Sequence, residues 1–88
     1  MRDVVFKGSS FKDFTNWLSE DKRVYLKIVE LIEETRRTPY EGKGSPEALK
    51  YHLEGMWSRK INNEHRLVYK VEPEYIEIVS CKFHYSRF

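Results

Sequence analysis

The sequence predicts an α+β domain made of an N-terminal strand, two helices and an antiparallel β-meander, with the helices packed on one face of the sheet. Three observations support this: a short β-branched segment at the N-terminus, two helical hydrophobic patterns before residue 38, and three β-rich segments after residue 55. A chain of 88 residues supports one hydrophobic core, so a single domain spanning residues 1–88 is expected. The content of 40% hydrophobic and 34% charged residues fits a folded domain with a well-solvated surface.

The N-terminal segment predicts a strand, a turn and a short helix. "RDVVF" is rich in β-branched residues, and "KGSS" after it contains turn formers and helix-capping residues. Ser10 followed by Asp13 resembles a capping box with the shorter acid. Phe11, Phe14 and Leu18 recur on one face of the helix that follows, which makes this the expected apolar face.

A second helix is predicted over "DKRVYLKIVELIEETRR", after the capping signal "SED". Its apolar stripe recurs at helical spacing and consists of Val24, Ile28, Leu31 and Thr35, with Val29 and Ile32 beside them. Arg36 and Arg37 stand at the C-terminal end, where the helix dipole favours cations. Pro39 then ends the helix, because proline cannot continue the hydrogen-bond ladder.

The second half of the chain begins with a long loop and continues with strands. "TPYEGKGSPEALKYHLEG" is rich in glycine and proline and is expected to be an ordered loop, with one helical turn at "PEAL". "MWSRKI", "HRLVYKV" and "YIEIVSCKF" alternate or cluster β-branched and aromatic residues, and the turn signals "NNE" and "EPE" separate them. Three successive antiparallel strands are therefore expected.

Charge and cysteine content restrict the classes of protein and partner. The stretch from Arg36 to Lys70 holds eight cations against four anions, whereas each flanking region is slightly acidic. Such a basic stretch suits contact with phosphates, although solvated surface lysines and arginines remain the alternative explanation. The single cysteine excludes an internal disulfide, and no apolar run reaches the ~18 residues of a membrane span. A cytoplasmic location, with no membrane partner, is expected.

The potential metal ligands and nucleophiles are a cysteine and three histidines. Cys81 and His84 have the spacing of a zinc half-site, but His52 and His65 are too far apart to complete it, so no metal is predicted. Cys81 lies in the apolar run "IVSCKF", where a lone cysteine usually acts as a small hydrophobic residue. We therefore expect Cys81 to be structural rather than a nucleophile.

One arginine in a predicted strand stands out. In "EHRLVYKV" the alternation of a strand places Arg66 and Val68 on the same face. A cation beside an apolar surface is costly unless an anion meets it, so Arg66 is expected either to bind a phosphate or to pair with Glu64 or Glu47. The sequence leaves these two alternatives open.

The run "RRTPYEGKGSPEALKYHLEGMWSRKINNEHRLVYKV" and the later "SCKFHY" closely resemble the YoeB/Txe branch of the RelE-type toxins of bacterial toxin–antitoxin pairs. The resemblance covers nearly the whole chain. It implies a RelE-like microbial ribonuclease fold and a small cytoplasmic enzyme that enters the ribosomal A site, contacts 16S ribosomal RNA and cleaves the messenger RNA without a cofactor. It also implies neutralisation by a YefM-type antitoxin, and homodimers occur in this family.

The same resemblance implies a catalytic set of Glu47, Arg66, His84 and Tyr85. Metal-independent RNA cleavage needs a base for the ribose 2′-hydroxyl, a cation for the charge that gathers on the phosphate, and an acid for the leaving 5′-oxygen. Glu47 would be the base, Arg66 the cation and His84 the acid, whereas Tyr85 would position the phosphate or a base. Beside this site, the expected contacts to the RNA backbone are Lys50, Arg59 and Lys60.

Two features depart from the family pattern. Family members commonly carry two arginines after "WS", whereas here Arg59 is followed by Lys60, which offers a point charge instead of a bidentate contact. Many members also finish at "HY", whereas this chain continues through Ser86, Arg87 and Phe88. These three residues could crowd Tyr85 or displace a functional terminal carboxylate.

Alternative explanations remain open for the same residues. Glu47 could stabilise a helical turn after Pro46, and His84 with Tyr85 could simply end the last strand. The basic stretch and exposed aromatic residues would also suit a module that binds ribosomal RNA or an acidic protein without cleaving anything. Glu47 discriminates between enzyme and binder, because a carboxylate in a phosphate-binding groove repels the ligand unless it has a chemical role. A plain protein-interaction domain would instead need Arg66 only for stability.

Overall fold

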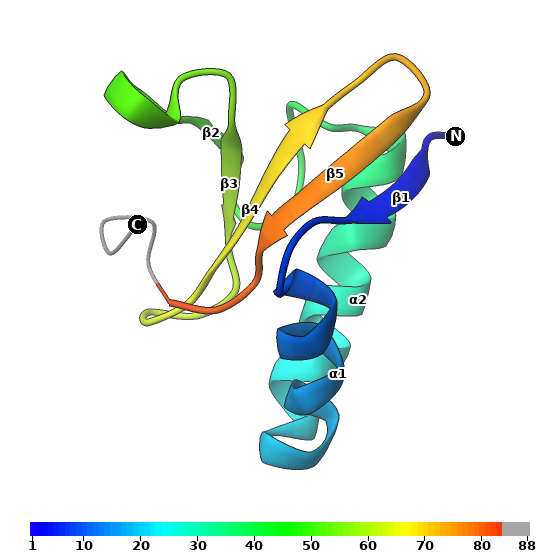
Figure 1. Ribbon diagram of the computed structural model, residues 1–88, viewed down its shortest axis with the longest axis vertical. Helices are drawn as coiled ribbons and strands as arrows, with labels where there is room; N and C mark the ends of the chain where they lie inside the picture. Colours follow the sequence, from blue (N-terminus) through cyan, green and yellow to red (C-terminus); the bar gives the residue numbers. More distant parts are fainter. Residues whose placement is uncertain (84–88) are drawn as a thin grey trace.

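The computed structural model describes residues 1–83, which form one five-stranded sheet with two helices against one of its faces (Figure 1). The sheet order is β1-β5-β4-β3-β2. β1 pairs with β5 in parallel, and the remaining neighbours are antiparallel. The elements along the chain are β1 (Asp3–Phe6), α1 (Ser10–Glu20), α2 (Lys22–Arg37), β2 (Glu47–Ala48), the 3₁₀ turn η1 (Tyr51–Leu53), β3 (Trp57–Lys60), β4 (Arg66–Val71) and β5 (Tyr75–Ser80). The predicted α+β class and meander are confirmed.

Helix α2 forms as the sequence predicts. The side chain of Asp21 accepts hydrogen bonds from the backbone N–H groups of Arg23 and Val24, which caps the first turn. The predicted stripe faces the sheet, and its buried members are Val24, Ile28, Leu31, Ile32 and Thr35. Because helix α2 buries this stripe, it supplies much of the main core. None of the described helices is long and apolar enough to cross a membrane.

Helix α1 differs from the prediction in both its cap and its buried face. Ser10 lies inside the helix, and its hydroxyl donates to the carbonyl oxygen of Ile78, so the proposed capping box is wrong. The side chains of Phe11 and Leu18 are 56% and 51% exposed, whereas Trp17 is buried. The Trp17 indole N–H donates to the carbonyl oxygen of Cys81 at 3.0 Å. This buried hydrogen bond and the large ring determine which side of the helix faces the sheet.

The helical turn predicted at "PEAL" is also wrong. Glu47 and Ala48 instead form β2, the edge strand beside β3. The backbone N–H of Leu49 donates to the carbonyl oxygen of Met56 at 2.9 Å and extends this pairing. A single helical turn of four residues has little stability, because helix nucleation is unfavourable. The edge of β3, in contrast, offers hydrogen-bond partners to the backbone of this segment.

The two faces of the sheet carry different clusters. The helix face packs Leu67, Tyr69, Ile76 and Ile78 against the helices in the main core. The opposite face, which we call the open face, carries a smaller cluster of Leu49, Leu53 and Val68, with Met56 and Val79 packed against it. Because side chains alternate along β4, Val68 on the open face places Arg66 there as well, as the sequence predicts.

Candidate functional site

The strand register brings two predicted catalytic residues to the open face. Glu47 of β2 lies opposite Ser58, which lies opposite Val68 of β4, and Arg66 lies opposite Lys60. Directly opposed residues point to the same face of a sheet. Glu47 and Arg66 are therefore two strand spacings and one side-chain step apart, roughly 12 Å between Cα atoms. Their long side chains can reach a group bound between them.

A pocket of about 360 Å³ adjoins Glu47 and is lined by residues 47–53. Glu47 and Lys50 were predicted as site residues, whereas Tyr51 and His52 were missed. Tyr51 is 89% exposed and has a φ of 57°, in the left-handed region that a tyrosine rarely occupies. An aromatic residue between a lysine and a histidine in a long loop was the available signal in the sequence. The ring is held away from the core and contributes little to packing.

Arg66 is tied to the β3–β4 turn but not to an acid. Its Nη1 donates to the carbonyl oxygens of Asn62 at 2.6 Å and of His65 at 3.1 Å. Within residues 1–83 it makes no ion pair with a carboxylate, so the suggested pairing with Glu64 or Glu47 is not formed. The turn carbonyls orient the guanidinium without neutralising its charge, and that charge remains available to an anion.

Arg59 occupies a position that contradicts its predicted contact with RNA. The residue is completely buried on the helix face. Its guanidinium donates to the carbonyl oxygens of Thr38, Glu41 and Lys43, and its Nε donates to the hydroxyl of Tyr69 at 3.2 Å. These contacts fix the loop between α2 and β2 from inside the protein. Arg59 is thus a structural residue, and Lys60 beside it is exposed.

The same loop depends on Gly44 and Tyr69. Gly44 has a φ of 82°, and an added Cβ would lie 3.0 Å from the Cβ of Arg59. Its carbonyl oxygen accepts from the backbone N–H of Lys60 at 2.7 Å. The Tyr69 hydroxyl donates to the carbonyl oxygen of Pro39 at 2.7 Å, and burial raises the pKa of this phenol. Together these contacts set the path by which the loop reaches Glu47.

The last described residues lie against the β3–β4 turn. The backbone N–H of Phe83 donates to Nδ1 of His65, and the backbone N–H of Arg66 donates to the carbonyl oxygen of Phe83. The predicted catalytic residues His84 and Tyr85 follow directly in the sequence and lie outside the described residues.

Cys81 is buried, and burial raises the pKa of its thiol to about 12. A thiol that stays protonated at neutral pH is a poor nucleophile, in line with the predicted structural role. Among residues 1–83, no three His, Cys, Asp or Glu side chains are grouped so that they could hold a metal ion.

Comparison with known proteins places this geometry in a family. The family model for the YoeB-like toxin of bacterial type II toxin–antitoxin systems matches residues 6–85. Toxin YoeB of Escherichia coli strain K12 is 50% identical over 82 residues, which cover 93% of this chain and 98% of that protein. The chain belongs to the YoeB toxin family.

Two solved relatives show the same architecture as this YoeB-family chain. The YoeB dimer from Staphylococcus aureus has a TM-score of 0.88 at 44% identity, and the match covers 96% of this chain and 98% of that one. YoeB of the same organism, in a heterotetrameric complex with YefM, has a TM-score of 0.87 at 43% identity, covering 97% and 99%. The predicted resemblance to the YoeB branch is confirmed.

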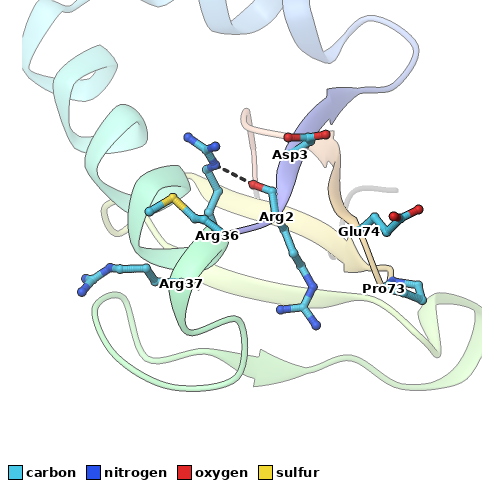
Figure 2. A pocket seen from close by; sticks show the side chains of 7 residues that line it. Arg2, Asp3, Arg36, Arg37, Pro73 and Glu74 are labelled. Atoms are coloured by element: carbon cyan, nitrogen blue, oxygen red, sulfur yellow. Dashed lines mark hydrogen bonds between the residues drawn. The ribbon is translucent and has the colours of Figure 1, made fainter.

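A second pocket of this YoeB-family chain contains none of the predicted site residues. Its volume is about 760 Å³, and Figure 2 shows side chains that line it, among them Arg2, Arg36, Arg37, Asp3 and Glu74. The Nε of Arg36 donates to the carbonyl oxygen of Arg2, and the guanidinium groups of Arg36 and Arg37 pair with acids of their own helix. Arg36 and Arg37 are thus paired with acids, whereas Arg2 donates through Nε to the carbonyl oxygen of Glu72.

Proposed function

We propose that this protein is a ribosome-dependent endoribonuclease that cleaves messenger RNA in the A site and thereby inhibits translation. One observation carries the proposal: Glu47 and Arg66, which makes no ion pair with an acid within residues 1–83, share the open face, beside a pocket lined by Lys50 and Tyr51. Membership of the YoeB family supports the same conclusion. The proposed RNA-binding site thus lies on the open face of the sheet, which the helices leave uncovered.

The proposed reaction needs only acid–base chemistry. Glu47 removes the proton of the ribose 2′-hydroxyl, whose oxygen then attacks the adjacent phosphorus. The bond from phosphorus to the 5′-oxygen breaks, and His84 supplies the proton that this oxygen takes, leaving a 2′,3′-cyclic phosphate and a 5′-hydroxyl. Arg66 stabilises the extra negative charge on the phosphate oxygens, and Tyr85 positions the phosphate or a base. No metal or other cofactor has a step in this scheme.

Two exposed lysines are the proposed contacts to the RNA backbone. Lys50 lines the pocket beside Glu47, and Lys60 lies opposite Arg66 on the neighbouring strand. Both side chains can approach phosphates without desolvating a buried charge. They are expected to hold the messenger and 16S ribosomal RNA of the small subunit against the open face.

A YefM-type antitoxin and a second toxin copy are the proposed protein partners in the cytoplasm. The solved Staphylococcus aureus relatives include a YoeB dimer and a YoeB–YefM heterotetramer. An acidic antitoxin segment that folds on binding would complement Arg66 and Lys60 and cover the apolar cluster on the open face. Such a segment blocks messenger access to Glu47.

The proposal is tested by mapping cuts in a translated messenger by primer extension, with ribosomes, purified protein and a metal chelator. We expect chelator-resistant cuts within the A-site codon for the wild type and loss of about 10²- to 10⁴-fold in rate for His84→Ala. Cuts that vanish with the chelator, although enough Mg²⁺ is present to keep the ribosomes intact, would contradict the metal-free scheme. An intact messenger on ribosomes that retain the bound protein would show a non-catalytic binder instead.

Tyr51 provides a separate prediction for the pocket. We expect its exposed ring to stack on a nucleobase. Because base stacking contributes ~1–3 kcal/mol, Tyr51→Ala should weaken the affinity of the protein for messenger RNA on the ribosome by about 10-fold. Tyr51→Phe keeps the ring and should bind like the wild type. Asparagine adopts the left-handed backbone more readily than tyrosine, so Tyr51→Asn should be more stable than the wild type and yet bind weakly. Binding is measured by sedimentation with ribosomes. If binding followed the stability of the three variants instead of the presence of the ring, the stacking role would be contradicted.

A further inference from the structure

His65 joins the β3–β4 turn to the end of the described chain. Its Nδ1 accepts a hydrogen bond from the backbone N–H of Phe83 at 2.8 Å. At the next residue, which is the first of β4, the backbone N–H of Arg66 donates to the carbonyl oxygen of Phe83 at 3.1 Å. Both polar groups of the Phe83 peptide backbone are therefore fixed by neighbouring residues of one turn.

The Phe83 backbone adopts an unusual conformation at this point. Its φ is 65°, in the left-handed region that residues with a Cβ rarely adopt. A conformation of this kind persists only where surrounding contacts determine it. Among the described residues, the hydrogen bonds to His65 and from Arg66 help to hold the Phe83 backbone in this conformation.

The imidazole is itself held rigidly. His65 is 7% exposed, and its ring meets the indole of Trp17 edge-on, with centroids 4.8 Å apart. The side-chain oxygen of Asn62 accepts from the backbone N–H of His65 at 2.7 Å. Because Nδ1 accepts a hydrogen bond, the ring proton of the neutral imidazole is assigned to Nε2, which lies 3.6 Å from Oε1 of Glu64. A fixed ring with a defined acceptor provides a precise anchor.

We propose that His65 is a positioning residue that anchors Phe83 and so fixes the starting point of the segment carrying the acid His84 and Tyr85. The inference rests on the proposed function, in which those two residues take part in cleavage. Arg66 belongs to the same turn, so this turn holds both Phe83 and the proposed phosphate-binding cation. Misplacement of a catalytic group by ~1 Å costs about 10²-fold in rate, which gives such an anchor a direct effect on activity.

A purely structural histidine in the core is the competing explanation. It predicts that activity follows stability and ring packing, whereas the anchor predicts that activity follows the hydrogen-bond acceptor. Two substitutions separate these properties. His65→Phe keeps an aromatic ring against Trp17 but removes the acceptor, whereas His65→Asn loses the ring but places an amide oxygen close to the position of Nδ1.

The first experiment measures single-turnover cleavage on programmed ribosomes together with the free energy of unfolding. We expect His65→Phe to lower the maximal rate by about 10- to 100-fold with unchanged half-saturation by ribosomes, and His65→Asn to retain much more activity despite a lower stability. The buried Ile61→Val serves as a matched core control with a modest stability loss and full activity. Equal activity of His65→Phe and the wild type, or activity that follows stability, would overturn the inference.

A second readout does not depend on cleavage. Amide hydrogen exchange of Phe83, followed by NMR, should be slow in the wild type and in His65→Asn and at least 10-fold faster in His65→Phe. Fast exchange in the wild type would exclude the anchor. If the wild type showed slow exchange but no cleavage on ribosomes, the proposed function would fail and the positioning role with it, while the Phe83 anchor itself would stand.

Discussion

Replacing Glu47 by glutamine is expected to lower the rate of messenger cleavage on the ribosome by about 10²- to 10⁴-fold. Glutamine has nearly the same shape, but its amide cannot take the proton of the ribose 2′-hydroxyl. Glu47 is exposed on a two-residue edge strand, so the substitution should leave the fold intact. Ribosome binding should stay the same or become tighter, since a negative charge near the RNA phosphates is removed.

The measurement is single-turnover cleavage on programmed ribosomes, paired with sedimentation to follow binding. Glu54→Gln is the matched control, because Glu54 is another exposed glutamate of the same loop region. Its cleavage rate should remain close to that of the wild type. A Glu47→Gln protein that cleaved at the wild-type rate would rule out Glu47 as the base. If the variant bound ribosomes weakly but cleaved at the wild-type rate once bound, Glu47 would serve in ribosome binding instead.

Replacing Arg59 by leucine is expected to destabilise the fold by about 3 kcal/mol, the largest stability effect that we predict. Leucine fills part of the volume but leaves the carbonyl oxygens of Thr38, Glu41 and Lys43 without their donor. Buried acceptors without a partner carry their full desolvation cost. Arg59→Lys keeps the charge but cannot reproduce the planar fork, so it should still cost about 1–2 kcal/mol.

Urea-induced unfolding measures these differences directly, with Lys60→Ala as the control at the exposed neighbouring position. That control should lie within about 0.5 kcal/mol of the wild type. The same series separates the two roles considered for Arg59. An Arg59 variant with wild-type stability and weak ribosome binding would support the predicted contact with RNA. Lower stability with normal ribosome binding per folded molecule would instead support the structural role, in which Arg59 holds the loop between α2 and β2.

The sequence predicts well those elements whose signals are local. The stripe of α2 recurs at helical spacing, Asp21 caps the helix, and all the predicted stripe residues except the half-buried Val29 are buried. The meander follows from β-rich segments separated by short turns, and alternation along β4 correctly places Arg66 with Val68. At the proposed site, the resemblance to the YoeB family singles out Glu47 and Arg66, and the strand register then shows them on the same face.

Contacts between distant segments decide the remaining features. The segment "PEAL" favours a helical turn by itself, but the edge of β3 makes it a strand. Arg59 resembles a surface cation in the sequence, yet the loop after α2 folds over it and supplies its carbonyl partners. In the sequence His65 resembles an ordinary strand histidine, but in the structure its Nδ1 accepts a hydrogen bond from the backbone N–H of Phe83, 18 residues later. Local spacing thus determines the elements of this protein. Burial and hydrogen bonding across the sheet depend on how those elements meet, and they decide which charged side chains are buried in structural contacts and which lie on the open face.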